Sequence, residues 1–176
     1  MANREALREL QTRLANRLQA ARTEGVSVAW LAVSSGAANY LLPLGQSGEI
    51  YPSSNVQAVP YARNWFRGVL NIRGGLYGVV DLAAFMVADT EFARPASTAS
   101  DASVVTLNPA LEVNCALQVE ALLGLRGAEA FVSSQPPDPA SPVYFGNRFV
   151  DTAGANWQEI NLRTLSQNSQ FLSISA

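Results

Sequence analysis

Short apolar runs separated by turn residues make up most of this sequence after Gly25. Each run has the length of a β-strand and is too short for a typical helix, and some alternate apolar with polar residues. The runs are VSVAWLAV, ANYLLPL, GVLNIR, LYGVVDL, ASVVTL, LEVNCALQV and VYFGNRFVDT. Many short strands without long helices between them predict a mainly β fold of the barrel or sandwich type.

A glycine pair, Gly74 and Gly75, separates the runs GVLNIR and LYGVVDL. A two-residue hairpin turn needs positive φ angles, which glycine adopts without a steric penalty. We therefore predict a β-hairpin with Gly74 and Gly75 at its turn.

Residues 1–24 follow a different pattern, with leucines at spacings of three, four and four and no glycine or proline before Gly25. This spacing predicts an amphipathic helix that ends at Gly25. The leucines of this stripe are Leu7, Leu10, Leu14 and Leu18. An exposed leucine row of this length gains nothing in water, so it must pack on the rest of the chain or on a partner.

The residue types exclude many enzyme mechanisms. The chain has no histidine and no lysine, because all 12 basic residues are arginine. Ser-His-Asp and Cys-His catalysis, imidazole metal ligation and Schiff-base chemistry are therefore ruled out. The single cysteine, Cys115, excludes an internal disulfide and a multi-thiolate zinc site, and its alternating surroundings predict a buried, inert thiol.

Charge is distributed unevenly along the chain. Residues 1–22 carry a net charge of +3 and the remainder carries −5, so the body is not a general binder of polyanions. We find no apolar signal-peptide core, and the long uncharged run at residues 25–48 is interrupted by polar residues and proline, unlike the continuous apolar run of about 18 residues that a membrane span needs. We therefore expect a cytoplasmic protein without direct membrane insertion.

Two groups of residues allow other functions. Glu49 and Asp81 form an acid/base pair for a small hydrolase only if the fold brings them into one pocket. The segment YARNWFRG interleaves arginines with Trp65 and Phe66, which suits an oligonucleotide-binding β-barrel, a protein interface or a loop anchored to the core. The acidic body argues against nucleic acid as a partner.

The order of motifs in the first half of the chain resembles the CheW family of chemotaxis adapters. The matching segments are YLLPL at 40–44, Glu49 with Ile50, Pro60, RGVLNIRG at 67–74 and VVDL at 79–82. ASVVTL and CALQVEALLGLRG resemble strands of the family's second half. The N-terminal helix and the segment DTAGANWQEINLRTLSQNSQFLSI are similar to PilI-type members, which serve type IV pilus systems.

The resemblance implies two five-stranded, SH3-like β-barrels packed together in residues 25–176, with residues 1–24 as a helical extension. It implies a non-enzymatic adapter, without a cofactor, that couples the cytoplasmic tip of a methyl-accepting chemoreceptor to a CheA-type histidine kinase. The chain would then be recruited to receptor arrays and would control twitching motility. Because such a core is expected to fold without an extension, a partner is slightly favoured over the chain's own body as the cover of the leucine stripe.

The resemblance also implies where partners bind. It places the receptor groove near Glu49 and Ile50 and the segment from Arg67 to Arg73, and kinase contacts on the apolar edge of the first barrel. The predicted interaction residues are Glu49, Ile50, Trp65, Phe66, Arg67 and Arg73. Gly68, Gly74 and Gly75 are predicted to allow tight turns or close backbone approach. A second interpretation of Arg73, a clamp that hydrogen-bonds loop carbonyls, stays open.

Overall fold

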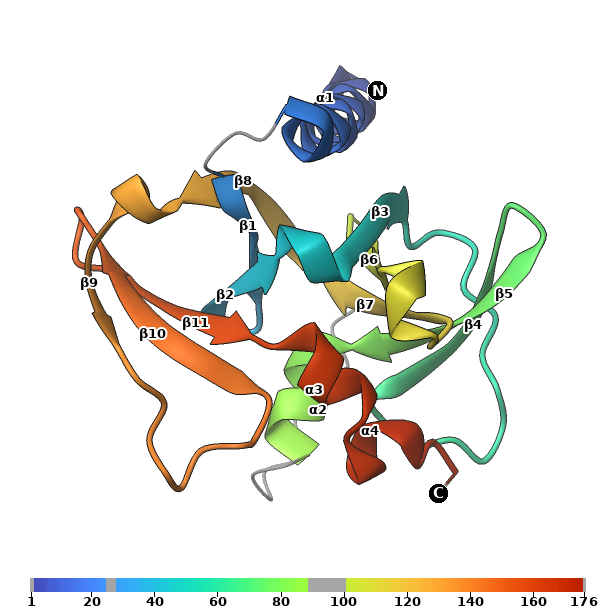
Figure 1. Ribbon diagram of the computed structural model, residues 1–176. Helices are drawn as coiled ribbons and strands as arrows, with labels where there is room; N and C mark the ends of the chain where they lie inside the picture. Colours follow the sequence, from blue (N-terminus) through green and yellow to red (C-terminus); the bar gives the residue numbers. More distant parts are fainter. Residues whose placement is uncertain (1, 25–27, 89–100, 176) are drawn as a thin grey trace.

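The computed structural model describes residues 2–24, 28–88 and 101–175 and consists of two curved β-sheets with a few helices (Figure 1). The N-terminal helix is α1 (Ala2–Glu24), and the predicted helix end at Gly25 lies outside the described residues. The mainly β fold with an N-terminal helix is therefore confirmed.

The first sheet has six strands in the order β8-β1-β2-β11-β10-β9. These strands are β1 (Val28–Ser35), β2 (Ala38–Pro43), β8 (Ala121–Gly127), β9 (Phe131–Gln135), β10 (Phe145–Asp151) and β11 (Asn156–Ile160). Its two edge strands follow each other in the chain, joined by the short 3-10 helix η3 (Ala128–Ala130). The predicted number of five strands is exceeded here because β9 adds to β10 as a further antiparallel strand.

The second sheet has the predicted five strands, in the order β3-β6-β7-β5-β4. They are β3 (Ser47–Pro52), β4 (Phe66–Ile72), β5 (Gly75–Asp81), β6 (Ser103–Leu107) and β7 (Cys115–Val119). The chain therefore starts in one sheet, builds the whole of the other and returns to complete the first. The return begins with β8, which pairs antiparallel with β1, and is completed by β11, which pairs in parallel with β2.

Short helices lie between and beside the strands. They are η1 (Leu44–Gln46), α2 (Leu82–Ala88), η2 (Pro109–Leu111), α3 (Leu162–Ser166) and α4 (Ser169–Leu172). In Figure 1, α1 lies on one side of the molecule, and α2, α3 and α4 lie on the opposite side. The contacts of α1 with β3, β8 and η1 agree with this placement.

Apolar side chains form three clusters, which explains the alternating pattern of the strands. Along β1, Leu31 and Val33 join the largest cluster, whereas Trp30 and Ala32 face a separate one with Phe131 of β9. Since β9 is at the far edge of the sheet, the contact of Trp30 with Phe131 at 5.8 Å between ring centroids requires a strongly curved sheet. The third cluster consists of side chains from strands of the five-stranded sheet: Leu70, Ile72, Val79, Val104 and Ala116.

The β4–β5 hairpin has the predicted two-residue turn, but the turn occurs one residue earlier. Ile72 pairs with Gly75, so the turn consists of Arg73 and Gly74, with φ angles of 49° and 81°. The side-chain oxygen of Asn71 accepts a hydrogen bond from the Gly74 N–H at 3.1 Å, which favours this register. Gly75 is the first residue of β5 and not part of the turn, which corrects its predicted role.

Gly68 lies where a second chain segment approaches β4. Its φ is +135°, and a Cβ atom there would lie 1.9 Å from the backbone oxygen of Gln57. Gln57 exchanges two backbone hydrogen bonds of 2.8 Å with Val69. The segment that follows β3 thus reaches β4, the opposite edge of the same sheet, and closes the five-stranded unit toward a barrel.

Candidate protein-interaction surface

Glu49 on β3 and Arg73 at the β4–β5 turn meet on the surface. Nη1 of Arg73 donates a hydrogen bond of 2.9 Å to Oε1 of Glu49, and their side chains are 76% and 42% exposed. The Tyr51 hydroxyl donates to the other carboxylate oxygen. The two residues come from opposite edges of the five-stranded sheet, so its curvature is what brings them together.

Local backbone geometry directs both charged side chains outward. The register between β3 and β6 shifts between Ser47 and Ile50, as in a β-bulge. The Glu49 N–H donates to the side-chain oxygen of Thr106 at 2.7 Å, which holds this irregular segment against β6. Arg73 projects from the tip of the hairpin because its left-handed backbone conformation belongs to the turn itself.

A groove of about 210 Å³ lies beside this ion pair, and helix α1 forms one of its walls. Ile50, Glu49 and Arg73 line it from the sheet, and Leu18 lines it from α1. Three residues that the sequence predicted as interaction residues therefore share one surface feature with part of the predicted leucine stripe. The groove has a mixed lining of apolar and charged groups, as protein interfaces do.

The ion pair adds little to stability because both partners are open to solvent. Exposed pairs of this kind contribute about 0–1 kcal/mol. Arg73 contacts a carboxylate and not loop carbonyls, so its bond differs from the predicted clamp. Burial raises the pKa of Tyr51 above its usual range, and the hydrogen bond to Glu49 raises it further. Tyr51 therefore stays a hydrogen-bond donor to Glu49 at neutral pH.

Trp65 does not lie on this surface, which corrects its predicted role as a contact residue. Its side chain is only 2% exposed and packs edge-on against Phe85 of α2, with 5.1 Å between ring centroids. Phe66 is half-buried beside Gly78, and Arg67 is half-buried on β4. A stacking platform for nucleic-acid bases needs exposed rings, so the oligonucleotide interpretation loses its main support.

Glu49 and Asp81 have different roles and do not form the pair that a hydrolase would need. Asp81 is buried, and its carboxylate accepts a hydrogen bond of 3.0 Å from the N–H of Ala84 at the start of α2. This is a helix-capping contact, whereas Glu49 is paired with Arg73 at the surface. Among the described residues, no cluster of histidine, cysteine or carboxylate groups could hold a metal ion.

The leucine stripe packs on the protein itself through its second half. Leu14 and Leu18 are buried, and Leu18 belongs to the largest core cluster. Leu7 is half-buried and Leu10 is 50% exposed. The sequence slightly favours a partner as the binding site of the leucine stripe. The structure corrects this preference for Leu14 and Leu18, which are buried against the chain itself.

Tyr51 is the main surface residue that sequence reasoning missed. It follows Glu49 by two residues in a strand, and residues at this spacing lie on the same face. The alternation of SGEIYP could therefore have indicated the contact between them. The wall contributed by α1 could not be predicted, since it depends on where the helix docks.

Comparison with known proteins identifies the family. The family model described as CheW-like domain matches residues 29–142. Among solved structures, the scaffolding protein TtCheW from Thermoanaerobacter tengcongensis is similar in fold, with a TM-score of 0.62 and 16% identity. The match covers 77% of this chain and 89% of that one. No curated protein matches the sequence.

The chain belongs to the CheW-like domain family. This membership supports a general role as a chemotaxis adapter. None of the helices in the described parts of the chain is long and apolar enough to span a membrane.

Proposed function

We propose that this chain is a non-enzymatic adapter that joins the cytoplasmic tip of a methyl-accepting chemoreceptor to a CheA-type histidine kinase. Family membership over residues 29–142 is the observation that carries the proposal. TtCheW, a solved structure with a similar fold, is described as a scaffolding protein. The absence of histidine and lysine from the sequence agrees with a role in binding rather than catalysis.

The groove beside Glu49, Ile50 and Arg73 is the surface that we propose for the receptor. It combines an apolar strand residue with an exposed ion pair, and arginine is common in protein interfaces. Arg67 lies near the start of β4, at the end of the hairpin away from Arg73, and does not line this groove, so we do not include it in the proposed surface. Phe66 packs against the largest core cluster and so anchors the hairpin to the core.

A charge reversal tests the role of Arg73 in binding. We expect Arg73→Glu to weaken binding to a receptor fragment or to the kinase by about tenfold, or about 1.4 kcal/mol, because it replaces an exposed donor with a like charge beside Glu49. Isothermal titration calorimetry against each purified partner measures this change. Unchanged affinity for both partners would remove Arg73 from the interface.

A double variant provides the matched control. Arg73→Glu combined with Glu49→Arg restores an ion pair between β3 and the hairpin with its polarity reversed. If the guanidinium at the turn contacts the partner, binding stays weak in the double variant. Recovery of binding would show that the ion pair only shapes the groove.

We further propose that the system served is one that controls type IV pili. The support is the resemblance of the N-terminal helix and the segment 151–174 to PilI-type adapters. In this role the chain would act at the cytoplasmic ends of receptors in membrane arrays. Deletion of the gene in a piliated host should abolish twitching and leave flagellar swimming intact, and the reverse result would contradict the assignment.

A further inference from the structure

A cavity of about 250 Å³ lies between the first half of α1 and the turn that follows β3. The second half of the helix is held by Leu14 and Leu18, which are buried. The first half is held less firmly: Leu10 is 50% exposed, Leu7 is half-buried, and Gln11 donates a hydrogen bond of 2.7 Å to the Ser103 side chain. The helix is therefore tightly packed at one end and stands over an open space at the other.

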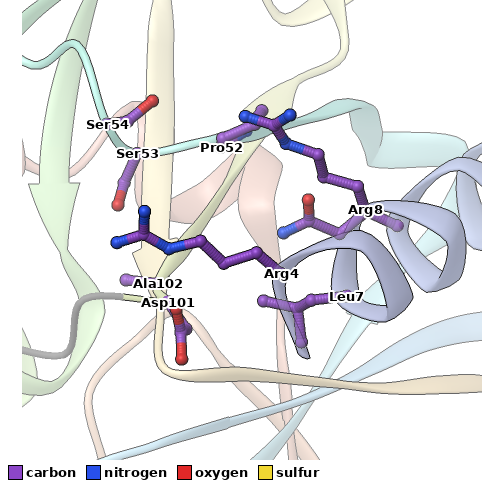
Figure 2. A pocket seen from close by; sticks show the side chains of 9 residues that line it. Arg4, Leu7, Arg8, Pro52, Ser53, Ser54, Asp101 and Ala102 are labelled. Carbon is purple, nitrogen blue, oxygen red and sulfur yellow. The ribbon is translucent and has the colours of Figure 1, made fainter. Parts of the chain in front are cut away.

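Two arginines of α1 point into this space. Arg4 and Arg8 are one helical turn apart and project toward the turn that carries Ser53 and Ser54 (Figure 2). Neither guanidinium has an ion pair or a side-chain hydrogen bond with the residues that the structure describes. The two groups are permanently charged and present several unused N–H donors.

The other lining groups make the cavity suitable for an anion. Ser53 and Ser54 line the cavity from the side opposite α1, and the Ser53 hydroxyl points toward the Arg4 guanidinium (Figure 2). Asp101 is the single carboxylate in the lining, so the two guanidinium groups leave a net positive charge. The segment that carries the two arginines has a positive net charge, +3 over residues 1–22, whereas the remainder of the chain is negative. An approaching anion therefore meets a favourable field.

We propose that this cavity binds a phosphoryl group, either as inorganic phosphate or on a small phosphate monoester. Its donors stand on two opposite walls, and a phosphoryl group directs oxygens to several sides at once. A carboxylate has only two oxygens in one plane and would reach one wall. A bound phosphoryl group joins Arg4 and Arg8 to the turn at Ser53 and so adds a second link between the first half of α1 and the sheet, beside the hydrogen bond from Gln11 to Ser103.

This inference goes beyond the adapter role, because phosphate binding requires neither receptor nor kinase. It nevertheless affects the adapter surface, since α1 also forms one wall of the groove beside Glu49 and Arg73. If phosphate holds the first half of α1 while Leu14 and Leu18 hold the second half, the wall that α1 contributes to the groove keeps one position. Binding of a phosphate in the cavity would thus change how α1 shapes the surface that we propose for partners.

Phosphate titration of the full chain tests the proposal. Inorganic phosphate and glycerol phosphate are titrated separately at constant ionic strength, with acetate as the carboxylate comparison, and binding is followed by nuclear magnetic resonance of the backbone amides. We expect saturable shifts at Ser53, Ser54 and the first half of α1 with one or both phosphates and weaker binding of acetate. Phosphate should also slow amide exchange in α1.

Two double variants with the same loss of charge separate a site from general attraction. Arg4→Gln with Arg8→Gln removes the lining guanidinium groups, whereas Arg13→Gln with Arg17→Gln removes two exposed charges that do not line the cavity. We expect affinity to fall about tenfold or more in the first and to stay within about twofold in the second. Ser53→Ala with Ser54→Ala should weaken binding from the opposite wall.

The proposal fails under any of three results. The first is a wild-type chain that shows no saturable binding of either phosphate. The second is an equal loss of affinity in both arginine double variants, which would indicate bulk electrostatics. The third is acetate binding as tightly as phosphate. None of these results bears on receptor or kinase binding, so the adapter role is tested separately.

Discussion

The β4–β5 hairpin and helix α1 are attached to the rest of the protein by different kinds of interaction. The hairpin is held through its backbone: β5 pairs in parallel with β7, and Val69 exchanges two hydrogen bonds with Gln57. Helix α1 is held through side chains, with two buried leucines and a hydrogen bond from Gln11 to Ser103. A backbone change in the hairpin should therefore disturb the sheet, whereas loss of a buried α1 side chain should undock the helix and leave the sheet folded.

The largest effect is expected at Gly68. Gly68→Ala would place a Cβ atom 1.9 Å from the Gln57 oxygen, at a φ of +135° that L-residues avoid. The backbone on both sides must move, so we expect the free energy of unfolding to fall by more than about 3 kcal/mol. Urea denaturation measures the change. Loss of less than about 1 kcal/mol would show that the approach of Gln57 is dispensable.

Gly45 provides a control for the Gly68 test, and Cys115 provides a second measurement. Gly45→Ala is the matched control, because nothing lies within 4 Å of the position of its Cβ atom, and it should be nearly neutral. Cys115 on β7 reports on the sheet itself, since burial raises its pKa to about 12 and keeps the thiol protonated at pH 8. Thiol reagents should modify Gly68→Ala faster than the wild type or Gly45→Ala.

An intermediate effect is expected for the buried end of α1. Leu18→Asp places a carboxylate in the largest core cluster, where Leu18 is 3% exposed. We expect the helix to undock, with a loss of about 2–4 kcal/mol in the free energy of unfolding. Leu10→Asp, the same substitution at a half-exposed position, should change it by less than about 0.5 kcal/mol.

Amide hydrogen exchange separates undocking from unfolding. In Leu18→Asp the amides of α1 should exchange much faster, whereas those of β5 and β7 should keep most of their protection. If β5 and β7 lose protection together with α1, then the helix and the sheet form one cooperative unit. The contrast between side-chain and backbone attachment would then be incorrect.

The smallest effect is expected at Arg73, where the backbone and the side chain can be tested separately. Arg73→Asn suits the left-handed φ of 49° and loses only an exposed ion pair, so stability should change by less than about 0.5 kcal/mol. Arg73→Val places a β-branched residue in the same conformation and should cost about 1–2 kcal/mol. Equal stability of the two variants would mean that the turn relaxes to another type.

The sequence allowed accurate prediction where the determinants are local. The strand-length runs, the helix at residues 2–24 and the hairpin between GVLNIR and LYGVVDL all follow from patterns within a few neighbouring residues. The burial of Cys115 followed from alternation along its strand. The position of the turn was missed by one residue, because glycine preference pointed to Gly75 while the Asn71 side chain favours the earlier register.

The candidate site was predictable only in part. Glu49, Ile50 and Arg73 were selected from family-like motifs, and they do share one groove. Trp65 was selected by the same reasoning and lies in the core. An aromatic residue beside an arginine has the same local pattern whether it anchors a loop or faces a partner, so only the neighbouring α2 decides its exposure.

The sequence by itself determined which segments are strands, which segment is a helix, and which catalytic chemistries are absent, since these depend on residue types and their spacing. Tertiary structure alone decided that the edges of the five-stranded sheet meet and pair Glu49 with Arg73. It also decided that the leucine stripe divides into a buried and an open half. The physical reason is that curvature and docking depend on contacts between segments far apart in the chain, which no local pattern encodes.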